Sequence, residues 1–349
     1  MRNAQALVDT GLRDLGYRYV NVDGCWQAVK RDGHGNLQPN SETFPSGMAE
    51  LGRRIHALGL RFGIYTSAGY RICTHPHRGS WNHFRKDMRR FAAWEVDYVK
   101  VDWCDVPKDS DPRDVYPRVA RAAAESGRTM LVTVSTPGVR KPWRWASRYG
   151  NTWRISADAD GTWRGVTATL DVDAPLARWA GPGGWNDPDM LQLGSPALSL
   201  TEQRSHFSLW AMLAAPLLEG YDVPSLDPES LAILKNERVI AVNQDRRGRQ
   251  ARRARRRNGL ETWVKPLRRR ERALLFLNRS GRERTAKVTL ADVPGLRDAP
   301  LYSTRELWTG EVALKEPEDE LRATVPPHGV AMWRIEPRAG GLPGAGSGR

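Results

Sequence analysis

The sequence predicts an α/β protein, a (β/α)8 TIM barrel followed by a small antiparallel β-sandwich domain. Short apolar, strand-like runs alternate with stretches of helical spacing over residues 1–245. Several of these runs end in a carboxylate, and the carboxyl ends of barrel strands usually carry the active site. Beyond Asp245 only short strands separated by turns remain, which indicates an antiparallel β domain.

The expected elements of residues 1–245 follow one another in regular alternation. Gly16, Gly59 and Gly127 each follow a helical stretch and mark its end. The predicted strands are Tyr17–Asp23, Leu60–Thr66, Tyr98–Asp102, Thr129–Ser135, Trp153–Ser156 and Ala214–Leu218. The predicted helices are Ala4–Leu15, Gly47–Leu58, Trp81–Trp94, Val115–Glu125 and Ser205–Leu213, and Leu231–Asn236 and Val239–Asn243 close this half. Gly181–Met190 is expected to be a loop rich in carboxylates. A doubly wound open sheet is the rival architecture, but it would need a glycine-rich phosphate turn after its first strand, and the sequence has none.

Residues 258–337 are expected to form the β domain. Its predicted strands are Leu260–Leu267, Ala273–Asn278, Thr285–Leu290, Ala323–Val325 and Val330–Ile335. Residues 246–257 are expected to be an arginine-rich linker, and the Gly- and Pro-rich tail, 338–349, is expected to be disordered.

The net charge of +14 is concentrated in the arginine-rich segment. Arg246–Arg257 contains eight arginines, and Arg268–Arg270 adds three more. Such a run could grip phosphates, and the alternative is a solvated linker. We favour the linker and expect no nucleic-acid partner, because no aromatic or Gly pattern for stacking bases is interleaved there. No run of 18 apolar residues exists, so we expect no membrane partner either. The oligomeric state stays open.

The cysteines and histidines limit which disulfides and metal sites the chain can form. Three cysteines cannot form a disulfide framework, although one pair is allowed. The seven histidines include no His-Glu-x-x-His, and no Cys pair has zinc-finger spacing, so we expect no cofactor and no required metal. Met1–Arg13 lacks an apolar h-region, so this stretch is no secretory signal.

Asp97–Cys104 is the stretch most suggestive of catalysis. It reads as a buried strand that delivers Lys100 and Asp102 at its carboxyl end. The alternative is an Asp that caps the next helix or pairs with Lys100. One acid at a strand end decides little, but the arrangement recurs along the chain.

Several motifs of acids and aromatic residues follow one another along the chain. They are Tyr19–Asp23 with Cys25 and Trp26, Arg31–Asp32, Phe44–Met48, Gly63–Tyr65, Asp97–Asp102, Trp153–Arg154 with Asp158, Gly181–Met190 and Asn243–Asp245. In this order they resemble glycoside hydrolase family 27, the α-galactosidases and α-N-acetylgalactosaminidases. The β domain after them is also expected of that family.

The resemblance implies a role for each matching residue. Asp102 matches the nucleophile and Asp158 the general acid/base of a retaining exo-α-glycosidase that removes terminal α-galactosyl residues. Positions matching sugar contacts are Asp23, Tyr65, Lys100, Arg154 and Asp189. Cys73 and Cys104 match a disulfide pair, which leaves Cys25 as the odd cysteine. The alternatives are isomaltodextranase-like or α-N-acetylgalactosaminidase-like specificity, or an inactive, truncated carbohydrate-binding protein.

The physical chemistry agrees with these roles. Retaining hydrolysis needs two carboxyls about 5–5.5 Å apart, one ionised to attack and one protonated to release the leaving oxygen. Lys100 lies two residues before Asp102 and so leans into the same face, where its ammonium would favour a charged Asp102. Trp26, Trp103 and Trp185 could pack on apolar sugar faces, and the alternative for each is core packing.

Three departures from the family pattern stand out. The chain starts at the first helix, without the family's opening strand, so we expect a truncated barrel with two unpaired edges. If an upstream signal peptide is missing with that strand, the protein would be secreted. Family α-galactosidases carry two adjacent acids where this chain has Asp23-Gly24, and a bulky Glu-Trp loop where it has Ser135-Thr136-Pro137. These two differences leave the choice of sugar open.

Overall fold

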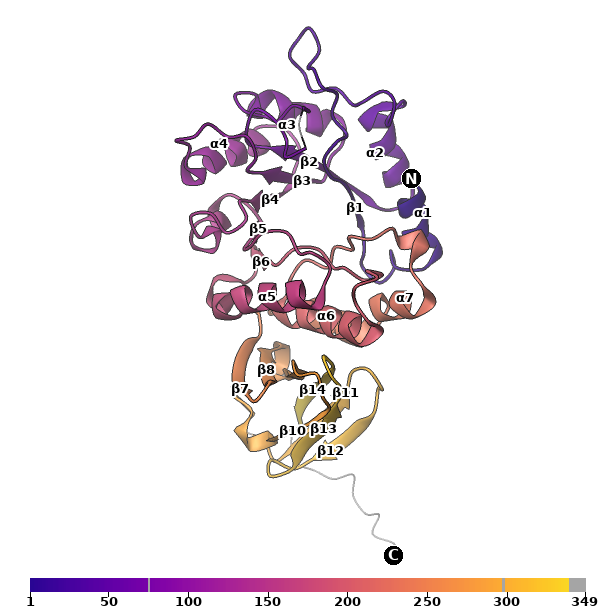
Figure 1. Cartoon of the computed structure of the whole chain (residues 1–349), viewed down its shortest axis with the longest axis vertical. Helices are drawn as coiled ribbons and strands as arrows, with labels where there is room; N and C mark the ends of the chain where they lie inside the picture. The colour runs from indigo at the N-terminus through magenta and orange to yellow at the C-terminus, as the bar shows by residue number, and fades with distance from the viewer. Residues whose placement is uncertain (75, 297–298, 339–349) are drawn as a thin grey trace, which may run out of the picture. The chain divides into compact units, whose positions relative to one another are not determined.

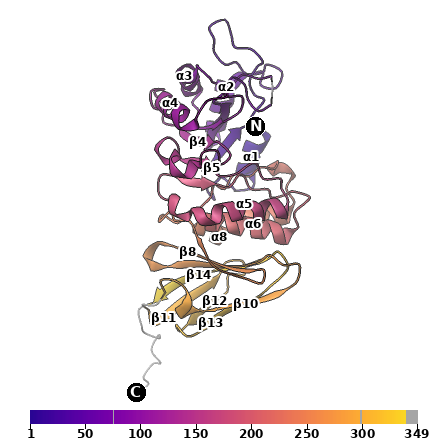
Figure 2. The same cartoon turned by 60° about the vertical axis from the view of Figure 1, so that its left-hand side comes forward.

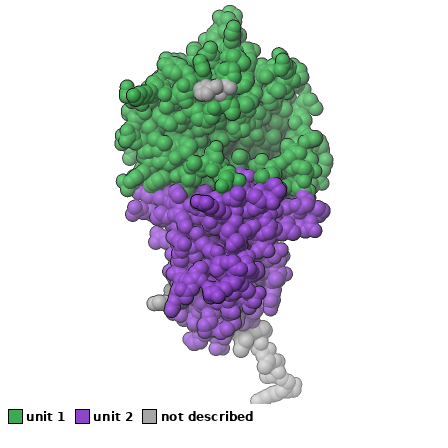
Figure 3. All heavy atoms as spheres, in the orientation of Figure 1, with its two compact units in different colours: residues 1–160, 183–190, 216–226 green, residues 161–182, 191–215, 227–349 purple. Residues whose placement is uncertain are grey.

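The computed structural model describes residues 1–74, 76–296 and 299–338. Of the expected disordered tail, only Arg338 falls within these ranges, as the last residue of a strand. The chain divides into two compact units, coloured separately in Figure 3. Unit 1 comprises residues 1–160, 183–190 and 216–226, and unit 2 comprises residues 161–182, 191–215 and 227–349.

Unit 1 is built on one parallel sheet whose strands pair in sequence order (Figure 1). The strands are β1 (Tyr19–Val22), β2 (Arg61–Ser67), β3 (Tyr98–Asp102), β4 (Leu131–Ser135), β5 (Thr152–Arg154) and β6 (Trp185–Asp187). The helices of this unit are α1 (Arg2–Asp9), α2 (Gly47–Ala57), α3 (Phe84–Ala93) and α4 (Pro112–Ala124), with short 3₁₀ turns η1 (Pro142–Arg144), η2 (Ala146–Arg148) and η4 (Val223–Ser225). This is the predicted strand–helix alternation of a (β/α) barrel.

Strand β2 shows how closely the layers of unit 1 pack. Six of its seven residues are buried, as expected for a parallel strand covered on both faces. Gly52 on α2 faces this strand, and a Cβ there would lie 2.8 Å from the Trp94 carbonyl oxygen and 3.0 Å from the Phe62 ring. Glycine is therefore required at this crossing, because any side chain would push the helix away from the sheet.

Unit 2 begins with helices and ends in the β-sandwich. Its helical elements are α5 (Trp163–Asp173), η3 (Ala174–Trp179), α6 (Leu200–Leu213), α7 (Pro228–Leu234) and α8 (Glu237–Asn243). Helix α6 starts with a complete capping box between Ser199 and Glu202 and is buried over ten of its fourteen residues. Such all-round burial is typical of a central helix rather than a surface helix.

The sandwich consists of a six-stranded and a two-stranded antiparallel sheet (Figure 2). The larger sheet has the order β12-β11-β14-β9-β8-β7, and the smaller pairs β10 with β13. The strands are β7 (Arg252–Arg257), β8 (Leu260–Pro266), β9 (Arg272–Asn278), β10 (Arg284–Thr289), β11 (Leu301–Glu306), β12 (Val312–Lys315), β13 (Glu320–Val325) and β14 (Val330–Arg338), with turns η5 (Arg268–Arg270) and η6 (Leu290–Asp292). A core of Leu, Phe, Tyr, Trp and Val side chains lies between the two sheets. The predicted antiparallel β-sandwich is confirmed.

Three expectations about elements are wrong, and one helix was missed. Ala214–Leu218 is not a strand: Ala214 ends α6 in the left-handed region, with φ of 55°, and Pro216 follows it. Gly181–Met190 is not loop throughout, because it contains β6. Helix α5 was not predicted at all. The expected linker, 246–257, contains β7, which pairs along β8. Among the described residues, no helix has the length and apolarity to cross a membrane.

Candidate active site

The register of the parallel sheet gathers the candidate residues at the carboxyl ends of neighbouring strands. Tyr65 on β2 is paired with Lys100 on β3, and Asp102 at the end of β3 is paired with Ser135 at the end of β4. Since side chains two residues apart share a face, Lys100 and Asp102 both project on the same side of β3. Three consecutive strands therefore supply one group of polar side chains.

Asp102 is held by donors from each of these strands. The Tyr65 hydroxyl donates to Oδ2 at 3.0 Å, while the Ser135 hydroxyl and the Trp103 backbone N–H donate to Oδ1 at 3.0 and 2.9 Å. Tyr65 is only 3% exposed, and burial together with the charge of Asp102 raises its pKa well above the ordinary value. Its hydroxyl is therefore a permanent donor, and the three bonds fix the carboxylate in one orientation.

A disulfide joins Cys73 to Cys104 beside this carboxylate, and Cys25 is a free cysteine. The Cys73 sulfur lies 3.2 Å from Asp102 Oδ2. The Ser67 hydroxyl, on β2, also donates to the Cys104 carbonyl at 2.7 Å. The disulfide and this hydrogen bond restrain the loop after β3, and with it the backbone next to Asp102. The pairing implied by the family resemblance is confirmed.

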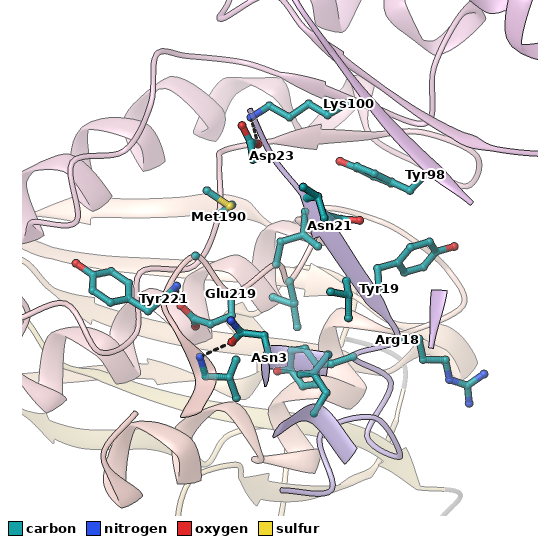
Figure 4. A pocket seen from close by; sticks show the side chains of 18 of the residues that line it. Asn3, Arg18, Tyr19, Asn21, Asp23, Tyr98, Lys100, Met190, Glu219 and Tyr221 are labelled. Atoms are coloured by element: carbon teal, nitrogen blue, oxygen red, sulfur yellow. Dashed lines mark hydrogen bonds and ion pairs between the residues drawn. The ribbon is translucent and has the colours of Figure 1, made fainter. Parts of the chain in front are cut away.

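Lys100 does not bond to Asp102 directly; its ammonium donates to Asp23 Oδ2 at 2.9 Å (Figure 4). The same ammonium lies 5.3 Å from the centre of the Tyr65 ring, a cation–π contact. Burial alone would lower the pKa of Lys100, but the bond and charge of Asp23, together with the charge of Asp102, raise it above its ordinary value. The lysine therefore stays charged and places a cation between two carboxylates.

Arg154, at the end of β5, organises a second group of acids. Its Nη2 lies 2.9 Å from Asp158 Oδ1 and 3.0 Å from Asp189 Oδ2. Burial would lower the pKa of Arg154, yet the charges of Asp187, Asp189 and Asp158 raise it. The side chain of Asp158 is 87% exposed and that of Asp189 only 6%, so the arginine links an exposed carboxylate to a buried one.

Asp189 is positioned by its own backbone. Its φ of 79° is uncommon for a residue other than glycine. Its N–H donates to Asp187 Oδ1 at 2.9 Å, and its own Oδ2 accepts the Ala159 N–H at 2.8 Å. Burial, reinforced by the charge of Asp189 and opposed by Arg154, raises the pKa of Asp187. The short segment after β6 thus reaches the loop that carries Asp158.

A cavity of about 580 Å³ opens onto these residues. Asp23, Tyr65, Lys100, Arg154, Asp187 and Asp189 all line it. Figure 4 shows the Lys100–Asp23 pair at one end of this cavity, near Met190. The five predicted sugar-contacting residues therefore line one cavity, while Asp102 and Asp158 are bonded to the lining residues Tyr65 and Arg154.

Two residues of this site were not predicted from the sequence, and for Trp26 the core-packing alternative holds. Ser135 was noted only as a small residue, although its place at the end of a strand paired with β3 could have indicated contact with Asp102. Asp187 lies two residues from Asp189 in the same acid-rich segment, and the sequence offers no feature that singles it out. Trp26 does not face a sugar: it is fully buried, packs against Phe91 and Trp94, and donates to the Tyr65 carbonyl. Trp103 stacks on Tyr116 and is partly exposed.

A barrel whose strand ends carry two groups of carboxylates around one cavity, one paired with a half-buried lysine and the other with a buried arginine, is typical of a glycoside hydrolase. Family models match nearly the whole chain: "Alpha galactosidase A" over residues 1–245 and "Alpha galactosidase C-terminal beta sandwich domain" over residues 257–335. The chain therefore belongs to the alpha-galactosidase family, glycoside hydrolase family 27.

Individual relatives agree with this assignment. The chain is 40% identical to an alpha-galactosidase of Oryza sativa subsp. japonica, over 96% of this chain and 79% of the rice protein. It is 37% identical to alpha-galactosidase 2 of Arabidopsis thaliana, over 97% and 84% of the two chains. Among solved structures, alpha-galactosidase I from Mortierella vinacea superposes with a TM-score of 0.89 at 29% identity, covering 97% of this chain and 93% of the other.

Proposed function

We propose that this protein is a retaining exo-α-galactosidase, in which Asp102 is the nucleophile and Asp158 the general acid/base. The observation that carries the proposal is the fixed orientation of the Asp102 carboxylate by Tyr65, Ser135 and the Trp103 N–H. A nucleophile that is oriented before the substrate arrives loses little entropy in the transition state. The names of the relatives, alpha-galactosidases from rice and Arabidopsis, support the choice of galactosides as substrates.

In the first step, an Asp102 oxygen attacks the anomeric carbon while the bond to the leaving oxygen breaks. Oδ1 accepts two hydrogen bonds and Oδ2 accepts one, so we assign the attack to Oδ2. Asp158 gives its proton to the leaving oxygen, which departs as an alcohol. The product of this step is a glycosyl ester of Asp102.

In the second step, water attacks the same carbon from the face vacated by the leaving group. Asp158 takes one proton from this water, the ester bond to Asp102 breaks, and the sugar leaves with its original anomeric configuration. Arg154 holds Oδ1 of Asp158, so its role is to position this carboxyl through both steps. Asp158 Oδ2 is bonded to no other described residue and is the oxygen we assign to proton transfer.

The cavity supplies the sugar contacts. Asp23 and Asp189 offer carboxylate oxygens to sugar hydroxyls, and Lys100 offers ammonium protons. Charged partners discriminate strongly between hydroxyl arrangements, because a substrate that misplaces one hydroxyl leaves a buried charge unsatisfied. An alpha-galactosidase from Saccharomyces cerevisiae, 26% identical and with a TM-score of 0.89, has been solved with raffinose, which supports a saccharide in this cavity.

The decisive experiment combines a substrate panel with stereochemistry. Nitrophenyl α-galactoside, α-N-acetylgalactosaminide and α-glucoside would be compared by kcat/KM, and the galactoside should be preferred. Proton NMR of the first-released sugar should show the α-anomer before mutarotation. First release of the β-anomer would exclude the double displacement, and a preference for another glycoside would replace galactose as the substrate.

A further inference from the structure

Strand β7 carries five arginines in six residues and is an outer strand of the larger sheet of the sandwich. Its pairing with β8 is interrupted by a bulge between Arg253 and Arg255, which leaves Ala254 without a partner. Between Arg253 and Arg255 the chain of β7 advances by two residues while β8 advances by one, from Trp263 to Thr262. The bulge therefore decides which arginines share a face.

On one face of β7 the arginines form ion pairs with carboxylates. Arg253 and Arg256 are paired with Trp263 and Glu261 of β8, which share a face of that strand. Both guanidinium groups reach Glu261, which is fully buried, and Asp171 of α5, where the Arg253 contact is 2.6 Å. Arg279 joins the same two carboxylates at 2.9 Å. These arginines are therefore committed to holding the sandwich on α5 within unit 2.

The second face of β7 is different. Arg252, Arg255 and Arg257 are paired with Val264, Thr262 and Leu260, so they share the opposite face. All three are exposed, and none of their side chains forms a hydrogen bond or ion pair within the described ranges 1–74, 76–296 and 299–338. We call these three residues the arginine strip.

The spacing of the strip is set by β8. Residues two apart on a strand are about 7 Å apart, so the backbone positions from which the three arginines project lie in a row at about that interval. The outer side of β7 has no neighbouring strand in the sheet, and the three arginines of the strip are exposed. A row of three exposed arginines without ion-pair partners matches a linear polymer with repeated negative charges better than a single small anion.

We propose that the arginine strip binds an acidic polysaccharide through its carboxylates. Each guanidinium presents a planar fork that fits a carboxylate bidentately, whereas lysines would act only as point charges. The side chains next to the strip on β8 are Leu260, Thr262 and Val264, so this face offers no aromatic ring on which a nucleic-acid base could stack. The choice of a polysaccharide rests on the proposed function, because the strip would hold a galactosidase on carbohydrate material.

The test compares binding to polygalacturonate with binding to neutral galactomannan at low ionic strength. The wild type should bind polygalacturonate, and the binding should fall steeply with salt, as exposed charges require. The triple variant R252Q/R255Q/R257Q should bind about tenfold or more weakly, the effect expected of three exposed ion pairs. The variant R252K/R255K/R257K, which keeps the charge but not the fork, should lie between the two.

A charge-matched control removes three arginines elsewhere. Arg54, Arg89 and Arg121 are exposed and also lack a bonded partner in the described structure, so R54Q/R89Q/R121Q loses the same charge. It should bind polygalacturonate like the wild type. Equal weakening in both triple glutamine variants, no binding by the wild type, or tighter binding of duplex DNA than of polygalacturonate would overturn the inference.

Hydrolysis of nitrophenyl α-galactoside separates this inference from the proposed function. All variants should retain wild-type kcat/KM on that small substrate, since none of the substituted arginines belongs to the proposed active site. Absence of turnover in every protein would refute the proposed function, while the binding comparison would still decide the role of the strip.

Discussion

The Ser135 hydroxyl donates a 3.0 Å hydrogen bond to Oδ1 of Asp102, and the two residues are direct register partners on β4 and β3. From the sequence, Ser135 stood out only as a small residue where the family's α-galactosidases carry a bulky loop. Its position in the sheet ties it to the proposed nucleophile instead.

We expect Ser135→Ala to lower kcat about tenfold with little change in KM, because one hydrogen bond to a charged group contributes about 1.5 kcal/mol. Steady-state kinetics on nitrophenyl α-galactoside measure this split. Thr136→Val is the matched control: the neighbouring hydroxyl is buried and has no hydrogen-bond partner among the described residues. Equal losses in the two variants would show a general disturbance of the loop rather than a role of the Ser135 bond.

The two proposed catalytic acids should separate by leaving group. Asp102→Ala should abolish turnover of every substrate, and azide should not restore hydrolysis with retention. Asp158→Ala should remain active on substrates with good leaving groups such as dinitrophenol, because these need little protonation. A Brønsted plot of kcat/KM against the leaving-group pKa measures the difference. If Asp102→Ala kept activity on activated substrates and Asp158→Ala did not, the two roles would have to be exchanged.

Gly24 should weaken the discrimination between galactose and glucose. A Cβ at this position would meet Ile72, Thr74 and Tyr65 at 3.5–3.8 Å, which is ordinary contact, so Gly24→Asp should fit without strain. The new carboxylate beside Asp23 should raise the ratio of kcat/KM for nitrophenyl α-galactoside over α-glucoside by about tenfold, the effect of one charged hydrogen bond.

Gly24→Asn provides the control for that substitution, since it has the same size without the charge. It should give a smaller increase in the galactose preference. A ratio unchanged in both variants would show that the acceptor for the axial hydroxyl lies on another loop.

Lys265 should make stability depend on pH. Its side chain is fully buried on β8 and donates to the Ala211 carbonyl at 2.7 Å. Burial lowers its pKa to about 7, against 10.5 ordinarily, with Asp245 opposing the shift. The unfolded chain therefore binds more protons than the folded chain between these two values, so the free energy of unfolding should rise with pH across that window.

Lys265→Met should flatten this rise, and the difference between wild type and variant isolates the contribution of the lysine. Urea unfolding at pH 7 and pH 9 measures it. The bond to Ala211 is lost at both pH values, so it shifts the whole curve without changing its slope. Parallel pH profiles for the two proteins would show that Lys265 titrates normally in the folded state.

Sequence patterns predict those parts of the fold in which the local residue preferences favour a single secondary structure. Tyr98–Asp102 was predicted to the residue, because its alternating β-branched and polar residues fit only a strand. Strand β7 could not be predicted in this way: arginines have no strand pattern, and the pairing is imposed by β8. Ala214–Leu218 failed for the opposite reason, since its apolar run is interrupted by a left-handed residue and a proline.

The candidate site divides along similar lines. Lys100 and Asp102 share a face by the period of the strand, which the sequence alone predicts. Whether Lys100 bonds to Asp102 or to Asp23 depends on how neighbouring strands are aligned, and the structure selects Asp23. The burial of Trp26 likewise depends on Phe91 and Trp94, which lie far along the chain.

The bulge at Ala254 bears on how β7 would tolerate the loss of one residue. A one-residue shift normally turns every side chain of a strand to the wrong face. In β7 the loss of Ala254 would leave an unbroken run of arginines opposite β8, so each β8 position would still meet an arginine. Asp171 and Glu261 would keep cationic partners after such a deletion. The ion pairs of this strand therefore depend on its composition more than on its register.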